Sequence, residues 1–252
     1  YTYGLFVALG FIGAITVSKW LGSRQGIDRQ AVSDLYFVIL VSALVGARGL
    51  YILVNLPEYR SNLLDIFKIW NGGLVFFGGF LAAAFAALVF IRIRRMPLWK
   101  TADIIAPGIA LGHALGRIGC LMAGCCYGKA CDLPYGITFS HPESLAPLNV
   151  SLHPTQIYMF LSNLILFGIL IWLTRQNRRP GLVFIAYIGL YSLFRFINEF
   201  FRGDFRGNFF FETLSLSQGI GVVVFCIALI LYIRLDRSGA HPKPDSASSS
   251  DA

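Results

Sequence analysis

Three arginines lie within stretches of the sequence that are otherwise strongly apolar: Arg48, Arg117 and Arg195. A guanidinium group keeps its charge in a protein, and burying it in a lipid bilayer is costly. An arginine in such a stretch therefore usually faces a partner, a cavity or an anionic ligand. A lone arginine near the end of an apolar segment can instead extend to the membrane surface. Three of them favour an anion-binding site within a membrane protein.

Arg117 belongs to the motif GHALGRIGCLMAGCCYGK, which begins at Gly112 in an apolar segment and ends in a turn rich in glycine and cysteine. The motif and its next residues hold four of the five cysteines: Cys120, Cys125, Cys126 and Cys131. Their spacing matches no usual zinc or iron–sulfur pattern, and adjacent cysteines are expected to chelate one ion poorly. We expect no metal and no cofactor. A disulfide such as Cys126–Cys131 and simple packing both fit, with packing favoured for Cys120 and Cys226.

A second charged motif, RFINEFFR, carries Arg195, Glu199 and Arg202 at spacings of four and three residues. Such spacings place the three side chains on one face of a helix. They can form a salt-bridge ladder that only stabilises the helix end. Alternatively, Glu199 positions two guanidinium groups and leaves excess positive charge for an anion. Two arginines against one glutamate slightly favour the second interpretation.

The motif NGGLVFFGGF, starting at Asn71, contains two glycine pairs. The pairs are Gly72–Gly73 and Gly78–Gly79, and Phe77 lies between them. Glycines there can expose backbone amides to an anion at a helix N-terminus. Packing between helices is the commoner use of membrane glycines, and the pattern alone favours it.

The longest connection, from about residue 127 to 156, leads into the motif HPTQIY, which begins at His153. Connections of this length often carry function. His153 has the chemistry of a general base. A capping or interfacial histidine is an equally good interpretation.

The elements that must position these residues are membrane-spanning helices. The chain has 252 residues, of which 56% are hydrophobic and only 13% charged, too apolar for an ordinary soluble domain. Seven spans are predicted, at about 4–21, 35–56, 73–93, 104–121, 157–173, 182–201 and 216–235. The first is too long for a signal-peptide core and is expected to be retained. We therefore predict an all-α polytopic membrane protein, with one catalytic domain over 1–237 and a disordered cytoplasmic tail over 238–252.

The net charge is +8, but the basic residues lie mostly in short connections between apolar segments, so we expect no nucleic-acid partner. The connections on one side of the membrane carry thirteen basic residues and those on the other side carry five. The positive-inside rule places the richer side in the cytoplasm, so the N-terminus is outside and the C-terminus is cytoplasmic. The long connection between the fourth and fifth spans is then extracytoplasmic. Arg48, Arg117 and Arg195 all fall in the outer half of their spans.

Together with VGARGLYIL (Val45–Leu53), these motifs in their order resemble those of the prolipoprotein diacylglyceryl transferase family, over most of the chain between Tyr3 and Leu235. The resemblance implies a bacterial inner-membrane enzyme. Members move the diacylglyceryl group of phosphatidylglycerol to the lipobox cysteine thiol of a preprolipoprotein and release glycerol phosphate. The implied partners are thus phosphatidylglycerol, the preprolipoprotein signal peptide with its lipobox, and the bilayer.

The resemblance also implies residue roles. Expected catalytic residues are Arg117, Arg195, Glu199, Arg202 and His153. Expected substrate-binding residues are Arg48, Gly72, Gly73, Phe77, Gly78, Gly79, Gly119, Gln156 and Tyr158. Guanidinium groups would stabilise the charge that grows on the leaving phosphate.

The sequence departs from the common family pattern at three positions. Many members have histidine where this chain has Phe77, glutamate where it has Met159, and asparagine where it has Cys120. The base-like role of that histidine does not carry over. Candidate proton acceptors are His153, Tyr158, Glu199 and His113, of which His153 is preferred; an electropositive site could also generate the thiolate unaided.

Two other functions stay open. One is a relative of the same fold that modifies a different acceptor or only binds lipid. The other, more distant, is a membrane thiol redox or metal protein that uses Cys120 to Cys131.

Overall fold

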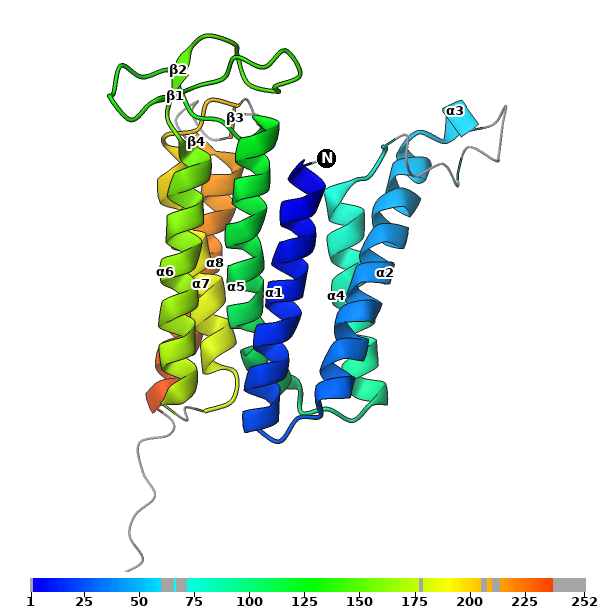
Figure 1. Cartoon of the computed structure of the whole chain (residues 1–252). Helices are drawn as coiled ribbons and strands as arrows, with labels where there is room; N and C mark the ends of the chain where they lie inside the picture. The colour runs from blue at the N-terminus through cyan, green and yellow to red at the C-terminus, as the bar shows by residue number, and fades with distance from the viewer. Residues whose placement is uncertain are drawn as a thin grey trace, which may run out of the picture. The chain divides into compact units, whose positions relative to one another are not determined.

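The computed structural model describes residues 2–59, 66, 72–176, 179–204, 208–209 and 214–237. In this part of the chain, seven helices are long and apolar enough to cross a membrane, as predicted (Figure 1). They are α1 (Thr2–Arg24), α2 (Arg29–Val54), α4 (Phe76–Ile93), α5 (Leu98–Ala123), α6 (Thr155–Arg175), α7 (Leu182–Glu199) and α8 (Leu216–Arg237). A single turn, α3 (Leu56–Tyr59), follows α2. The predicted disordered tail, 238–252, lies outside the described residues.

Helix α5 begins six residues earlier than predicted, because polar residues continue it toward its start. Thr101 is fully buried and donates its hydroxyl to the carbonyl of Pro97, so its polar group is satisfied within the helix. Asp103 is also buried. Pro107 lies inside the helix without ending it. The span predicted at 104–121 is thus part of one of the two longest helices described.

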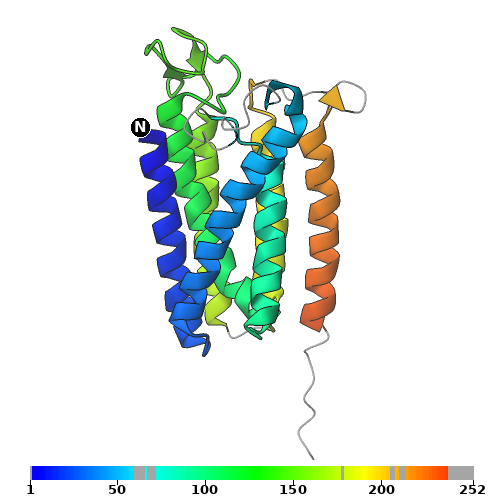
Figure 2. The same ribbon diagram turned by 90° about the vertical axis from the view of Figure 1, so that its right-hand side faces the viewer.

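The helices group into two compact units: residues 1–14 with 105–252, and residues 15–104. In the unit of residues 15–104, α2 and α4 pack along each other (Figure 2). Their contact is close because both helices carry glycine. A Cβ on Gly46 would lie 2.5 Å from the carbonyl oxygen of Gly78, and one on Gly79 would lie 2.9 Å from that of Ala43. Arg94 also pairs with Asp34 at 2.7 Å.

The larger unit has its core where α5, α6 and α7 meet. Seven buried residues form this cluster: Ala106, Ala110, Leu166, Leu170, Leu173, Val183 and Tyr187. The first part of α1 packs on α5, where a Cβ on Gly10 would lie 2.9 Å from the Gly112 carbonyl oxygen. Helix α8 packs along α7. Small residues at these contacts allow helices to approach closely.

Two short ladders lie beside the helix ends of this unit. Strand β1 (Ile137–Thr138) pairs antiparallel with β2 (Ser151–Leu152), and β3 (Asn208–Phe209) pairs antiparallel with β4 (Leu214–Ser215). The first ladder organises the long connection between α5 and α6 (Figure 1). Neither ladder was predicted, since each has only two residues per strand.

Candidate functional site

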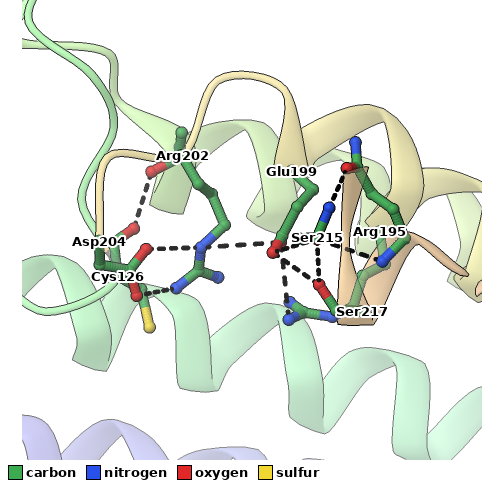
Figure 3. Close-up of polar contacts among 9 residues, drawn as sticks. Cys126, Arg195, Glu199, Arg202, Asp204, Ser215 and Ser217 are labelled. Carbon is green, nitrogen blue, oxygen red and sulfur yellow. Dashed lines mark hydrogen bonds and ion pairs between the residues drawn. The ribbon is translucent and has the colours of Figure 1, made fainter. Parts of the chain in front are cut away.

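Glu199, the last residue of α7, lies between two arginines (Figure 3). Its Oε2 is 3.7 Å from Nη2 of Arg195 and 3.9 Å from Nε of Arg202. The predicted grouping of these side chains is therefore observed. Arg202 does not share the helix face as expected, because α7 ends before it; a turn brings its side chain back to Glu199.

Two serines that sequence reasoning missed hold the other oxygen of Glu199. Ser217 donates to Oε1 at 2.6 Å, and Ser215 donates to it at 3.1 Å. Ser215 also accepts from the backbone N–H of Gln218, whose side chain accepts from the backbone N–H of Ser215. This reciprocal arrangement is a capping box at the start of α8. The pattern S-x-x-Q before an apolar run was the available sequence signal.

Asp204, also missed, pairs with Arg202 through two hydrogen bonds. Arg202 donates from Nε to Oδ1 at 2.8 Å and from Nη2 to Oδ2 at 2.6 Å, and its side chain is 3% exposed. Burial alone would lower the pKa of this guanidinium, but the bonds to Asp204 outweigh burial and raise the pKa above its usual value. The count of two arginines against one glutamate was therefore wrong, because Asp204 supplies a second carboxylate.

Arg117 on α5 restores the positive excess. It interacts electrostatically with Arg202, with Tyr191 of α7 and with the thiols of Cys120 and Cys126. None of the ion pairs in the described part of the chain involves Arg117. The cluster of Arg117, Arg195, Glu199, Arg202 and Asp204, here called the arginine cluster, thus holds three positive and two negative groups.

An extended segment, Tyr127–Ala130, connects the parts of this site. On one edge, Lys129 N–H donates to the carbonyl of Phe201 and Gly203 N–H donates to that of Tyr127. On the other edge, His153 N–H donates to the carbonyl of Lys129. Gly128 is bridged to Arg202. The cysteine-rich turn is thereby fixed between the end of α7 and the start of α6.

The five cysteines are all free, so of the two alternatives left open by the sequence the Cys126–Cys131 disulfide is not formed. Instead, the sulfurs of Cys120, Cys125 and Cys126 lie within 4.8 Å of one another. The backbone turns at Cys126, whose φ is 59°, and its sulfur thereby lies close to those of Cys120 and Cys125. Hydrogen bonds from the Cys120 and Cys125 thiols, together with Arg202, hold the pKa of the Cys126 thiol well below its usual range.

His153 lies beside a pocket of about 400 Å³. Its Nδ1 is 3.2 Å from the hydroxyl of Tyr158, and the rings of both pack against Phe201. Asn198, which sequence reasoning missed, also lines the pocket, and its Oδ1 is buried without a hydrogen bond among the described residues. For His113, another candidate base, the Nδ1 atom is 3.4 Å from the hydroxyl oxygen of Tyr187 on α7.

Gln156 and Gly119 have structural contacts. Gln156 is 2% exposed and donates to the carbonyl of Cys125 at 2.9 Å, while Thr155 donates to that of Cys126 at 2.7 Å. Gly119 is buried, and a Cβ there would lie 3.2 Å from Tyr3 of α1. Both residues therefore shape the site without facing an open cavity.

In the unit of residues 15–104, Arg48 is 8% exposed and donates to backbone carbonyls. Its Nε bonds to Ile66 at 2.9 Å, and its Nη1 bonds to Gly72 at 2.8 Å and to Gly73 at 3.3 Å. Both glycines have left-handed backbones, with φ of 82° and 76°. These bonds hold the turn that leads into α4.

The other residues of the glycine motif lie on α4. Gly78 and Gly79 pack against α2, which agrees with the packing interpretation. Phe77, at the position of the family histidine, is 68% exposed within the structure.

Comparison with known proteins decides the family. The family model of prolipoprotein diacylglyceryl transferase matches residues 1–234. The chain belongs to the prolipoprotein diacylglyceryl transferase family. The sequence resemblance is therefore confirmed, and so is the expectation of an integral membrane transferase of lipoprotein biosynthesis.

Curated relatives match along nearly their full length. A phosphatidylglycerol–prolipoprotein diacylglyceryl transferase from Clostridium tetani is 33% identical over 237 residues, covering 94% of this chain and 93% of the relative. The protein of the same name from Geobacter sulfurreducens is 34% identical, covering 95% and 92%. That from Paracidovorax citrulli is 37% identical, covering 88% and 86%.

Proposed function

We propose that this transferase moves the diacylglyceryl group of phosphatidylglycerol to the lipobox cysteine thiol of a preprolipoprotein, at the outer face of the bacterial inner membrane. The names of its relatives specify the lipid and the class of protein acceptor. The observation that supports the reaction in this chain is the arginine cluster. Arg195 and Arg202 are held by Glu199 of α7 and by Asp204 just after it, and Ser217 at the start of α8 fixes Glu199.

The reaction requires charge stabilisation on phosphate. The acceptor thiolate attacks the glyceride carbon, a C–S bond forms, and the C–O bond to phosphate breaks. The bonding electrons pass to the phosphate oxygen, and glycerol phosphate leaves. Fixed guanidinium groups stabilise that charge because they are already oriented and need no reorganisation. Arg117 and Arg195 bind the phosphate, while Glu199 and Asp204 position Arg195 and Arg202.

The thiol proton must also be accepted, since the thiolate is the nucleophile. His153 takes this role, with Tyr158 orienting its ring through the contact at 3.2 Å. The adjacent pocket, lined by His153, Tyr158 and Asn198, receives the acceptor peptide. Arg48 positions the turn at Gly72 and Gly73, and this turn, with Phe77 of α4, binds the lipid.

The proposal is tested by an in vitro lipidation assay with phosphatidylglycerol and a lipobox peptide. Wild-type protein should yield lipidated peptide and glycerol phosphate in equal amounts. Arg117→Ala should lose at least about a hundredfold in kcat/KM, or about 2.7 kcal/mol of transition-state stabilisation. Arg94→Ala, which removes an exposed ion pair with Asp34 outside the arginine cluster, is the matched control. A wild-type protein that forms no product where a relative does would refute the proposal.

A second candidate function is transfer to a different acceptor, or lipid binding without transfer. It is favoured by Phe77, which stands where many family members have histidine. It predicts that wild type is inactive toward the lipobox peptide and that Phe77→His gains activity. An active wild type excludes it.

A further inference from the structure

The distances between the sulfur atoms of Cys120, Cys125 and Cys126 are close to those between three sulfur ligands of one metal ion. The sulfur atoms lie within 4.8 Å of one another. Four-coordinate zinc with bonds of about 2.3 Å to sulfur places two thiolates about 3.8 Å apart. The thiols therefore need to approach by about an ångström or less, which rotation of cysteine side chains provides.

The backbone fixes this convergence. Cys120 is in the last turn of α5, and Gly124 with φ 69° and Cys126 with φ 59° fold the following turn back toward it. Thr155 and Gln156 hold the carbonyls of Cys126 and Cys125 through hydrogen bonds of 2.7 and 2.9 Å. A non-glycine residue in the left-handed region costs free energy, and such strain is found where side chains must be aimed.

The surrounding charge suits deprotonated thiols. Arg117 interacts electrostatically with Cys120 and Cys126, and Arg202 with Cys126. Three thiolates and one divalent cation carry a net charge of −1, which these two guanidinium groups offset. Without a cation, three thiolates at this separation would repel one another strongly.

We propose that Cys120, Cys125 and Cys126 bind one thiophilic divalent ion of the zinc class as three thiolate ligands. Thiolates select such ions over Mg²⁺ and Ca²⁺, and three protein ligands leave the fourth tetrahedral position to water or another exchangeable ligand. Cys131 is not a ligand. The proposed site borders the arginine cluster through Arg117 and Arg202, but ion binding there does not depend on the proposed transfer reaction.

Cobalt(II) is the test ion, because thiolate ligation gives it visible and near-ultraviolet charge-transfer absorption. Full-length protein in detergent is reduced, stripped with chelator and titrated without oxygen, after its five thiols have been counted. We expect saturation at one cobalt per chain and loss of the absorption when zinc is added. Cys126→Ser and Cys120→Ser should weaken binding at least a hundredfold. Cys131→Ser and Cys226→Ser, which alter thiols outside the cluster, should bind as wild type.

A second measurement uses wild-type protein alone, so it tests the proposal even if the cysteine variants fail to fold. Zinc-loaded wild-type protein is alkylated with a maleimide and mapped by mass spectrometry. Zinc should protect Cys120, Cys125 and Cys126 while leaving the labelling of Cys131 and Cys226 unchanged. The proposal is overturned by fully reduced wild-type protein that shows no thiolate–cobalt absorption, or by zinc that protects all five cysteines or none.

Discussion

At the scale of single residues, Glu199 is the group on which the arginine cluster depends. One of its oxygens accepts two hydroxyl hydrogen bonds, and the other faces the guanidinium groups of Arg195 and Arg202. The carboxylate is thereby fixed in rotation. Both guanidinium groups are attracted to it at distances longer than a hydrogen bond, so their orientation is sensitive to small shifts of this one side chain.

Ser217→Ala removes the 2.6 Å hydrogen bond to Glu199. A hydrogen bond to a charged group contributes about 1.5–3 kcal/mol, so we expect the free energy of unfolding to fall by about 2 kcal/mol. The transfer rate should also fall, because Glu199 then rotates more freely. Thermal unfolding in detergent and the lipidation assay measure the two effects. Ser192→Ala, which removes a hydroxyl that donates to the Ile188 carbonyl within α7 at 2.8 Å, is the control. Equal behaviour of the two variants would contradict this role for Ser217.

Among the described residues, Asp204→Ala leaves the nearly buried Arg202 with Glu199 as its remaining carboxylate, at 3.9 Å. We expect at least a tenfold loss of kcat/KM, because Arg202 is then less well fixed and its interaction with Arg117 is less screened. Asp204→Glu keeps the carboxylate and should recover part of the activity. Wild-type activity in Asp204→Ala would show that Glu199 alone positions Arg202.

At the scale of elements, the segment Tyr127–Ala130 joins the start of α6 to the end of α7, and Gly128 is its tightest point. A Cβ on Gly128 would overlap the His153 carbonyl and lie 2.9 Å from the Phe201 carbonyl oxygen. Backbone on both sides leaves no flexible side chain that can give way.

Gly128→Ala should therefore destabilise the protein by at least about 2 kcal/mol and abolish transfer, since the segment must separate from one neighbour. Gly168→Ala, inside α6 with open space around its Cβ, should instead gain up to about 1 kcal/mol. Chemical denaturation of the two variants gives the comparison. A Gly128→Ala protein as stable as wild type would show that the segment does not join the two helices.

Much of the fold was predictable from the sequence, because a membrane span requires about twenty apolar residues in one stretch. Helical spacing correctly predicted that Arg195 and Glu199 lie together, whereas Arg202 reaches Glu199 through the turn after α7. Asp204 and Ser217 could not be assigned to the site, because their partners depend on how the chain turns after α7 ends. The convergence of Cys125 and Cys126 depends on a left-handed backbone at a non-glycine residue, which composition does not reveal.

At the scale of the whole molecule, the distribution of basic residues predicts an extracytoplasmic N-terminus and a cytoplasmic C-terminus. A green fluorescent protein fused after Ala252 should fluoresce, and alkaline phosphatase fused there should be inactive. Phosphatase fused after Ser140, in the long connection between α5 and α6, should be active. The reverse pattern would place the arginine cluster at the cytoplasmic face and would refute the proposed site of transfer.

Ser215 and Ser217, at the start of the last helix, complete the coordination of a carboxylate sixteen and eighteen residues earlier in the chain. A ribosome-bound nascent chain therefore acquires this constellation only when α8 has been synthesised and inserted. Six of the seven long helices described precede these serines, so they can enter the bilayer before Glu199 gains its two hydroxyl donors.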